Sequence, residues 1–409
     1  MIAGKADNGL QYAVRRSGNA VAYCSLSIRC GTRDEGNCHS GIAHFTEHTI
    51  FKGTLKRSAA VINGCLDRLG GELNAYTTKE EIVLHATVLK EDLPKALSLL
   101  LELASQATFP EREIETEKGV VIDEIIQCKD SPADYIYDRF EEMLYEGHPL
   151  GRSILGTAAS VRHITSDELR GFVREHFTPE RMALTVVADL DERRMQTLIA
   201  KLASTLGTQS LGAPAFSGVT ERPTVRHFDV TLDKHHHEAN AIIGGEAPSL
   251  YDHERRIACV LLSNILGGPA SNSILGKILR ERHGWVYAVD CSYTQYSDSG
   301  LVTIALGCDK ANLSKCFPAI RKAISDLQDK PLSDVRLKSY RKQLLGQLAI
   351  SSDNGETQCL SMGKSLLSYG RIASDEENRC ALEAVTAQQL QDLACSLLDE
   401  SKLSRLILL

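Results

Sequence analysis

Apolar residues recur along the chain with two spacings, and their order predicts a succession of strands and helices. Runs that alternate every second residue predict strands, and longer runs with apolar residues three and four apart predict helices. In the first half we expect strands at residues 10–14, 21–29, 72–76, 82–88 and 182–187, and helices at 42–51, 59–69, 93–105, 111–128, 135–145 and 165–176.

A similar order of elements follows after residue 223. We expect strands at 226–232, 238–244, 286–295 and 300–307, helices at 252–266 and 273–282, and further helices towards the C-terminus. The stretch 207–223 is rich in Gly, Ser, Pro and Thr, which predicts a linker. The sequence therefore predicts an α+β protein with an N-terminal domain at 1–206 and a C-terminal domain of like architecture at 224–409, each with a mostly antiparallel sheet and helices packed on it.

Composition narrows the classes of partner. The net charge of −7 leaves no basic surface of the kind that binds nucleic acid. The most apolar stretch, 97–104, is far shorter than the roughly 20 residues that a membrane span needs, and the N-terminus lacks a signal-peptide pattern. The 12 cysteines include no C-x-x-C pair, which is typical of free thiols in a reducing compartment. We therefore expect a cytoplasmic protein that binds neither nucleic acid nor a membrane.

The first candidate for chemistry is the motif H-x-x-E-H, formed by His44, Glu47 and His48. On a helix, positions four apart lie one above the other, so the two imidazoles can bind one metal ion. Glu47 lies beside them, where a carboxylate can act as a general base. This motif is the inverzincin signature, the inversion of the commoner H-E-x-x-H.

A hydrolytic zinc site needs a third protein ligand, which usually comes from another helix. The predicted helix at 111–128 contains Glu117 and Glu124, which are seven residues apart and therefore share a face. Either carboxylate could approach the two histidines.

The chain resembles the pitrilysin and mitochondrial-processing-peptidase family in several further motifs, in family order. These are G-T-R-D-E at 31–35, F-K-G-T at 51–54, G-G-E-L-N-A-Y-T at 70–77, E-K-x-V-V-x-x-E-I at 117–125, H-P-L-G at 148–151, L-G-G-P at 266–269, L-R-E-R-H-G-W-V-Y at 279–287 and Y-S-D-S-G at 296–300. The resemblance thus covers both halves of the chain. The chain is similar to small bacterial members of the family with two domains.

The resemblance implies a zinc metalloendopeptidase in which two homologous domains form a clamshell around short or unfolded peptides. It implies one Zn²⁺ per chain, with Glu124 as the third ligand and Glu117 as a supporting acid that orients a histidine. It also implies that a peptide substrate adds to the edge strand at Asn74 and Ala75. The second domain would hold no metal ligands and would supply Tyr287 as a group that grips the substrate.

One position departs from the family pattern. Active members carry an arginine in an S-R-L triplet of the second domain, and here that position is Ile274. An aliphatic side chain cannot donate hydrogen bonds to a developing oxyanion. Three readings remain open: a homodimer that is active despite the change, a catalytic subunit whose zinc-less paralogue supplies the Arg-Tyr pair, or a peptide-binding or assembly subunit without catalysis.

Overall fold

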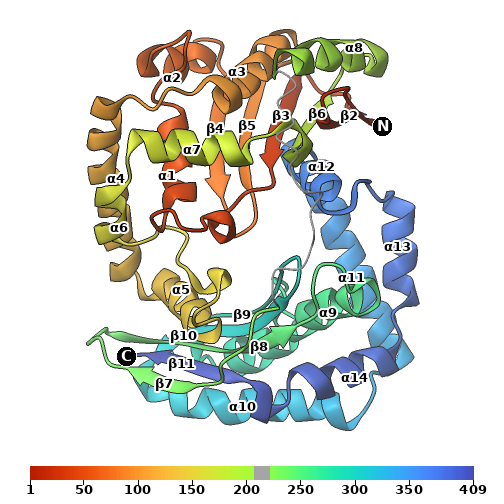
Figure 1. Cartoon of the computed structure of the whole chain (residues 1–409). Coiled ribbons are helices and arrows are strands. Elements are labelled where there is room, and N and C mark those ends of the chain that lie inside the picture. Colours follow the sequence, from red (N-terminus) through yellow and green to blue (C-terminus); the bar gives the residue numbers. More distant parts are fainter. Residues whose placement is uncertain (207–221) are drawn as a thin grey trace. The chain divides into compact units, whose positions relative to one another are not determined.

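The computed structural model describes residues 1–206 and 222–409, which divide into two compact units with one sheet each (Figure 1). The first unit comprises Met1–Ile126, Arg152–Phe216 and Ile350–Ala373. The second comprises Gln127–Gly151, Ser217–Ala349 and Ser374–Leu409. Each unit therefore takes segments from both halves of the sequence. The predicted linker, 207–223, falls almost entirely outside the described residues.

The first unit is built on a six-stranded sheet in the order β1-β2-β6-β3-β5-β4. Only the pairing of β2 with β6 is parallel among its neighbouring strands. Its strands are β1 (Ile2–Lys5), β2 (Gln11–Arg16), β3 (Val21–Ile28), β4 (Glu72–Thr77), β5 (Ile82–Leu89) and β6 (Met182–Ala188). Its longer helices are α1 (Ile42–Ile50), α2 (Ala59–Asp67), α3 (Leu93–Gln106), α4 (Glu111–Asp130, which runs on into the second unit), α6 (Ala158–His163), α7 (Ser166–His176), α8 (Glu192–Ala203) and α12 (Gly355–Tyr369).

The second unit repeats this topology with a five-stranded sheet in the order β7-β11-β8-β10-β9. In both sheets, leaving out β1, the order is first, last, second, fourth and third along the chain, and the first and last strands pair in parallel. Its strands are β7 (Asp229–Leu232), β8 (Glu238–Ala247), β9 (Val286–Gln295), β10 (Gly300–Asp309) and β11 (Ser404–Leu408), and its helices are α5 (Pro132–Leu144), α9 (His253–Gly267), α10 (Lys310–Asp329), α11 (Asp334–Asp353), α13 (Asp375–Ala384) and α14 (Ala387–Leu397). The predicted α+β class with two mostly antiparallel sheets is confirmed.

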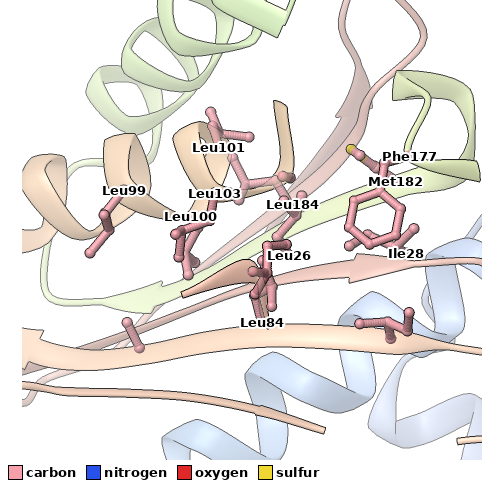
Figure 2. Close-up of a cluster of buried hydrophobic side chains, with 14 of the residues drawn as sticks. Leu26, Ile28, Leu84, Leu99, Leu100, Leu101, Leu103, Phe177, Met182 and Leu184 are labelled. Atoms are coloured by element: carbon pink, nitrogen blue, oxygen red, sulfur yellow. The ribbon is translucent and has the colours of Figure 1, made fainter. Parts of the chain in front are cut away.

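Helix α3 covers one face of the first sheet. Figure 2 shows its leucines above side chains of β3, β5 and β6, with Leu26, Leu84 and Leu184 directly beneath them. These side chains are fully buried, and burial of a leucine contributes about 1.5–3 kcal/mol. This core fixes the sheet whose edge strand and flanking helix α1 form the candidate site.

The opposite face of the same sheet is covered by α12, a helix from the C-terminal part of the sequence (Figure 1). The strand residues on this face include the small polar side chains of Ser25, Ser27 and Thr185, and all three are fully buried. A Cβ atom on Gly363 would lie 2.4 Å from Ser27 Oγ, so α12 can approach the sheet this closely only with glycine at that position.

Most of the predicted elements begin or end within three residues of the observed bounds, and one differs in type. The strand expected at 226–232 begins only at Asp229. The helix expected at 273–282 is a π-helical segment, Gly276–Arg282, whose wider turns place side chains differently from an α-helix. None of the helices in the described part of the chain combines the length and apolar composition needed to cross a bilayer.

Candidate metal centre

Helix α1 carries all three residues of the H-x-x-E-H motif. Its apolar residues, Ile42, Phe45 and Ile50, are fully buried in the first core. The hydroxyls of Thr46 and Thr49 donate to backbone carbonyls one turn earlier, so these polar side chains are satisfied inside the core. The motif residues therefore lie on a helix that is anchored along its apolar face.

His44, His48 and Glu124 lie close together in the structure. The imidazole ring centroids are 4.6 Å apart. Glu124 Oε2, from α4, lies 3.3 Å from His48 Nε2 and 3.8 Å from His44 Nε2. Among the described residues, these three form the one group of His, Cys, Asp or Glu side chains whose ligand atoms all lie within 4.8 Å of one another.

This donor set fits zinc. Two imidazole nitrogens and one carboxylate oxygen at about 2.0–2.2 Å from a tetrahedral ion lie roughly 3.3 Å from each other, and the separations to Glu124 are close to this value. Three protein ligands leave a fourth position open, as in catalytic rather than structural zinc sites. Glu124 is half-exposed, so the open side can be reached from solvent.

Glu117 fixes the orientation of His48. Its Oε1 lies 3.0 Å from His48 Nδ1, and its Oε2 lies 2.6 Å from Lys52 Nζ. With Nδ1–H donating to this carboxylate, Nε2 carries the free lone pair and faces Glu124. The sequence assigned Glu117 an orienting role, and its position is compatible with that role. The sequence analysis did not identify Lys52. This residue follows His48 by four positions, and its ammonium group pairs with the other carboxylate oxygen of Glu117.

The two imidazoles have different electrostatic surroundings. Burial and the neighbouring His48 lower the pKa of His44 to about 3, so this ring is neutral near physiological pH. Burial also lowers the pKa of His48, but the hydrogen bond with Glu117 and the nearby charges of Glu124 and Glu47 outweigh it, and the net shift is upward. The carboxylates around His48 thus make it the more basic ligand.

Glu47 is held by a threonine that the sequence analysis did not single out. Thr77, the last residue of β4, donates from Oγ1 to Glu47 Oε2 over 2.7 Å. Burial raises the pKa of Glu47, and the bond from Thr77 opposes this shift. The hydroxyl therefore occupies one carboxylate oxygen and leaves Oε1 for a proton.

We expect Thr77→Val to lower kcat by about tenfold while KM and zinc content stay unchanged, because valine keeps the shape and loses the hydrogen bond to a charged group. Steady-state kinetics on zinc-loaded protein measures this. Thr87→Val, on the neighbouring strand β5, is the matched control. An unchanged kcat in Thr77→Val would show that the hydroxyl does not orient Glu47.

Asn74 and Ala75 lie on β4, at the edge of the first sheet. Asn74 is exposed and stands opposite His85 of β5, whose Nδ1 pairs with Glu356 Oε1 of α12 at 2.9 Å. Ala75 faces the other way and packs against the first core. The free edge of β4 can accept an added strand, and a role for Asn74 and Ala75 in that contact stays a prediction.

Tyr287 and Ile274 both lie in the second unit. Tyr287, on the edge strand β9, is exposed, and its hydroxyl donates to Asp309 Oδ1. Ile274 is half-buried and packs against the second core. The position thus has an apolar packing role, and no hydrogen-bond donor stands there.

Comparisons with known proteins agree with these motifs. A family model described as insulinase (peptidase family M16) matches residues 12–158, and one described as the peptidase M16 inactive domain matches residues 163–344. The uncharacterized zinc protease YmxG of Bacillus subtilis is 30% identical over 373 residues, covering 91% of this chain and 89% of that protein. The chain belongs to peptidase family M16. The family resemblance found in the sequence motifs is thereby confirmed.

Another relative supports the same assignment, and two solved structures share the fold. The uncharacterized zinc protease ML0855 of Mycobacterium leprae is 30% identical over 383 residues, covering 93% of this chain and 85% of that protein. A protease from Helicobacter pylori has a TM-score of 0.89 at 19% identity and is matched over 98% of its chain. A peptidase M16 inactive domain from Pseudomonas fluorescens has a TM-score of 0.90 at 18% identity and is matched over 97%. At these identities the two structures show the fold alone.

Proposed function

We propose that this M16 protein is a zinc-dependent metalloendopeptidase that hydrolyses short or unfolded peptides, with one Zn²⁺ per chain. The observation that carries the proposal is the complete set of His44, His48 and Glu124 with Glu47 beside them on the same helix. The names of the relatives as zinc proteases support it.

Each residue of the centre has a chemical task in this proposal. His44, His48 and Glu124 would hold a zinc ion, which when bound would act as a Lewis acid that polarises the scissile carbonyl and lowers the pKa of a water molecule. Glu47 accepts a proton from the attacking water and returns it to the leaving amine. Thr77 keeps the carboxylate of Glu47 in orientation, and Glu117 keeps Nε2 of His48 turned inward.

The substrate binds as an added strand along β4. A peptide that adds to the free edge of β4 passes beside Thr77, the last residue of this strand. Thr77 in turn contacts Glu47. Main-chain hydrogen bonds give affinity without strong dependence on side chains, which suits short or unfolded peptides. Asn74, exposed on this strand, contacts the peptide backbone.

Zinc content separates the peptidase from a peptide-binding or assembly subunit of the same fold. The peptidase purifies with one zinc per chain, or takes it up with a dissociation constant below the micromolar range, whereas a scaffold needs no stoichiometric metal. Metal analysis after dialysis against a weak chelator, followed by zinc titration, measures this. A chain that takes up no zinc would contradict the proposal.

Ile274 favours one variant of the proposal, in which a second subunit takes part. The chain forms a dimer, either with itself or with a zinc-less paralogue. In the second case the paralogue supplies the Arg-Tyr pair. The lack of a hydrogen-bond donor at Ile274 favours the paired form slightly. We place the protein in the cytoplasm, where its 12 free cysteines stay reduced.

Ile274→Arg is expected to raise kcat/KM of the isolated, zinc-loaded protein, by up to about 10², because it restores a donor for the developing oxyanion. Ile274→Leu, which restores no donor, is the control, and thermal unfolding of both variants checks that the second core tolerates the change. A stable Ile274→Arg protein with no gain over the unchanged chain would contradict the account of a missing donor.

A further inference from the structure

Helix α1, which carries His44 and His48, begins without a side-chain cap of its own. Its N-cap residue is Gly41, which has φ 91° and no side chain to accept a hydrogen bond. A Cβ atom at this position would lie 2.7 Å from the carbonyl oxygen of Leu155, so no larger residue fits. Other helices of the first unit do have such caps, for example Thr165 at α7 and Asp191 at α8.

Glu35 reaches the start of helix α1 from an earlier loop. Its Oε1 accepts from the backbone N–H of Gly41 at 2.9 Å and from that of Ala43 at 3.3 Å. These are among the first amides of a helix, which have no partner inside the helix itself. A carboxylate there is also favoured by the helix dipole. Glu35 thus does from a distance what an N-cap side chain does locally.

The carboxylate of Glu35 is buried and incompletely hydrogen-bonded, an arrangement that lowers the stability of the fold. The residue is 1% exposed, and its Oε2 is buried with no hydrogen-bond partner among the described residues. Burial raises its pKa to about 7, and the amides of Ala43 and Gly41 oppose the shift, as do the charges of Arg152 and Lys79. A buried and incompletely bonded carboxylate is rare in proteins and calls for a specific explanation.

The loop that carries Glu35 is bound to the end of the substrate strand. The backbone N–H of Thr32 donates to Thr78 O, and that of Arg33 donates to Lys79 O at 2.9 Å. These acceptors directly follow Thr77, which holds the general base. The same loop therefore joins the start of helix α1 to the two residues that directly follow Thr77.

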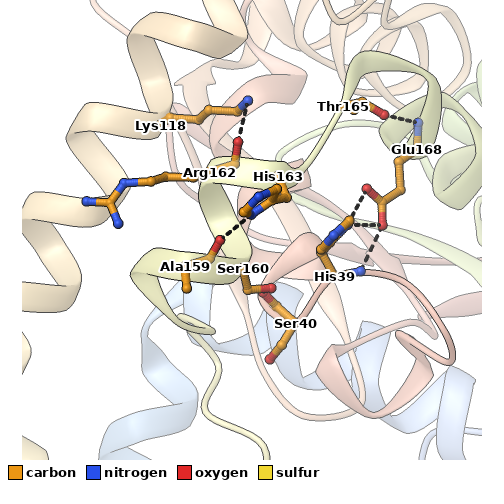
Figure 3. Close-up of polar contacts among 9 residues, drawn as sticks. All are labelled: His39, Ser40, Lys118, Ala159, Ser160, Arg162, His163, Thr165 and Glu168. Carbon is orange, nitrogen blue, oxygen red and sulfur yellow. Dashed lines mark hydrogen bonds and ion pairs between the residues drawn. The ribbon is translucent and has the colours of Figure 1, made fainter.

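Other contacts hold the chain just before helix α1 but do not cap it. Figure 3 shows His39, whose backbone N–H and ring both bond to Glu168 of α7, and Ser160 of α6, whose hydroxyl donates to Ser40 O. In the same view Lys118, from α4, donates to Arg162 O of α6. These bonds attach the two ligand-bearing helices to α6 and α7, whereas Glu35 bonds to the first amides of α1.

We propose that Glu35 is a positioning residue for the metal centre, because it keeps the first turn of helix α1 closed. His44 is the third residue of this helix, so an open first turn would displace the ligand itself. The inference rests on the proposed function, since it assumes that His44 binds zinc. It adds a residue, outside the ligands and their contacts, on which the geometry of the centre depends.

The test compares two variants of Glu35. Glu35→Met fills the same volume but has no oxygen to accept hydrogen bonds from the backbone N–H groups, whereas Glu35→Gln keeps an acceptor oxygen. At pH 8, Glu35→Met is expected to bind zinc about 10–100 times more weakly in chelator competition, in the range seen when an outer partner of a ligand is lost. Glu35→Gln is expected to stay near the unchanged protein. Asp191→Ala, which removes the cap of α8, controls for loss of a cap elsewhere in the same unit and should leave zinc affinity intact.

Amide hydrogen exchange on the metal-free proteins makes the test independent of the proposed function. In Glu35→Met, peptides covering residues 39–48 are expected to exchange about tenfold faster, while Asp191→Ala leaves them unchanged. Equal exchange in Glu35→Met and the unchanged protein would overturn the inference, and so would equal loss of zinc affinity in the Met and Gln variants. Failure of the unchanged protein to bind zinc would instead overturn the proposed function, and the exchange result would still decide the role of Glu35.

Discussion

Glu47→Gln is expected to bind zinc as tightly as the unchanged protein and to cleave peptides at least about 10² times more slowly. Glutamine has nearly the same shape and can still accept a hydrogen bond from Thr77, but it cannot take a proton from water. The loss therefore falls on kcat, with KM and metal content unchanged. Peptide turnover and zinc analysis on the same preparation measure both quantities.

Glu115→Gln is the matched control for this variant. Glu115 is an exposed glutamate of α4 that pairs with Lys118, so the same chemical change there should leave kcat intact. Residual cleavage by Glu47→Gln above a tenth of the unchanged rate would remove Glu47 as the general base.

Glu124→Gln is expected to lose zinc affinity by more than 100-fold. Replacing an outer partner of a ligand already costs about 10–100-fold, and Glu124 contributes one of three ligand atoms directly. An uncharged amide oxygen is a much weaker zinc ligand than a carboxylate, and His44 and His48 alone leave the ion with two protein ligands. Chelator competition and metal analysis after dialysis measure the change.

Asp123→Asn gives the control for Glu124→Gln. Asp123 is the preceding residue on α4, is exposed, and points about 100° away around the helix, so it lies off the metal-binding face. It should bind zinc as the unchanged protein does. If Glu124→Gln kept stoichiometric zinc after dialysis, Glu124 could not be the third ligand.

The parts of the centre that follow from helical periodicity could be predicted from the sequence. His44, Glu47 and His48 come together because a helix places residues three and four apart on one face, and the local apolar periodicity predicts that helix. Glu124 lies on another helix, so periodicity could only place it on a face with Glu117. Its convergence with the histidines was expected from the family resemblance, and the structure brings the three within 4.8 Å.

The supporting residues could not be predicted from the sequence in the same way. Thr77 and Glu35 act over 30 residues or fewer in sequence, but their contacts depend on how β4 and the loop before α1 fold onto the helix. Lys52 had a local signal, since it follows His48 by four residues. The glycine at position 41 was a second signal, because glycine has no side chain to accept hydrogen bonds from the first amides of a helix.

The packing of α12 shows the same limit at the level of the fold. The sequence of α12 predicts a helix but not the sheet that this helix covers. The structure places α12 on the first sheet, although it follows most strands of the second sheet in the chain. The glycine at 363 and the small residues of β3 make this close approach possible. Such complementarity between distant segments is not visible in the periodicity of either one.

The most direct test of the account is turnover of a quenched fluorescent peptide library by the isolated, zinc-loaded protein, with Glu47→Gln as the blank. The account predicts cleavage that requires zinc and is lost in Glu47→Gln. Mass spectrometry of the products then gives the peptide bonds that are cut. Absence of cleavage by both the zinc-loaded protein and its zinc-loaded Ile274→Arg variant, or equal cleavage in the Glu47→Gln blank, would contradict it.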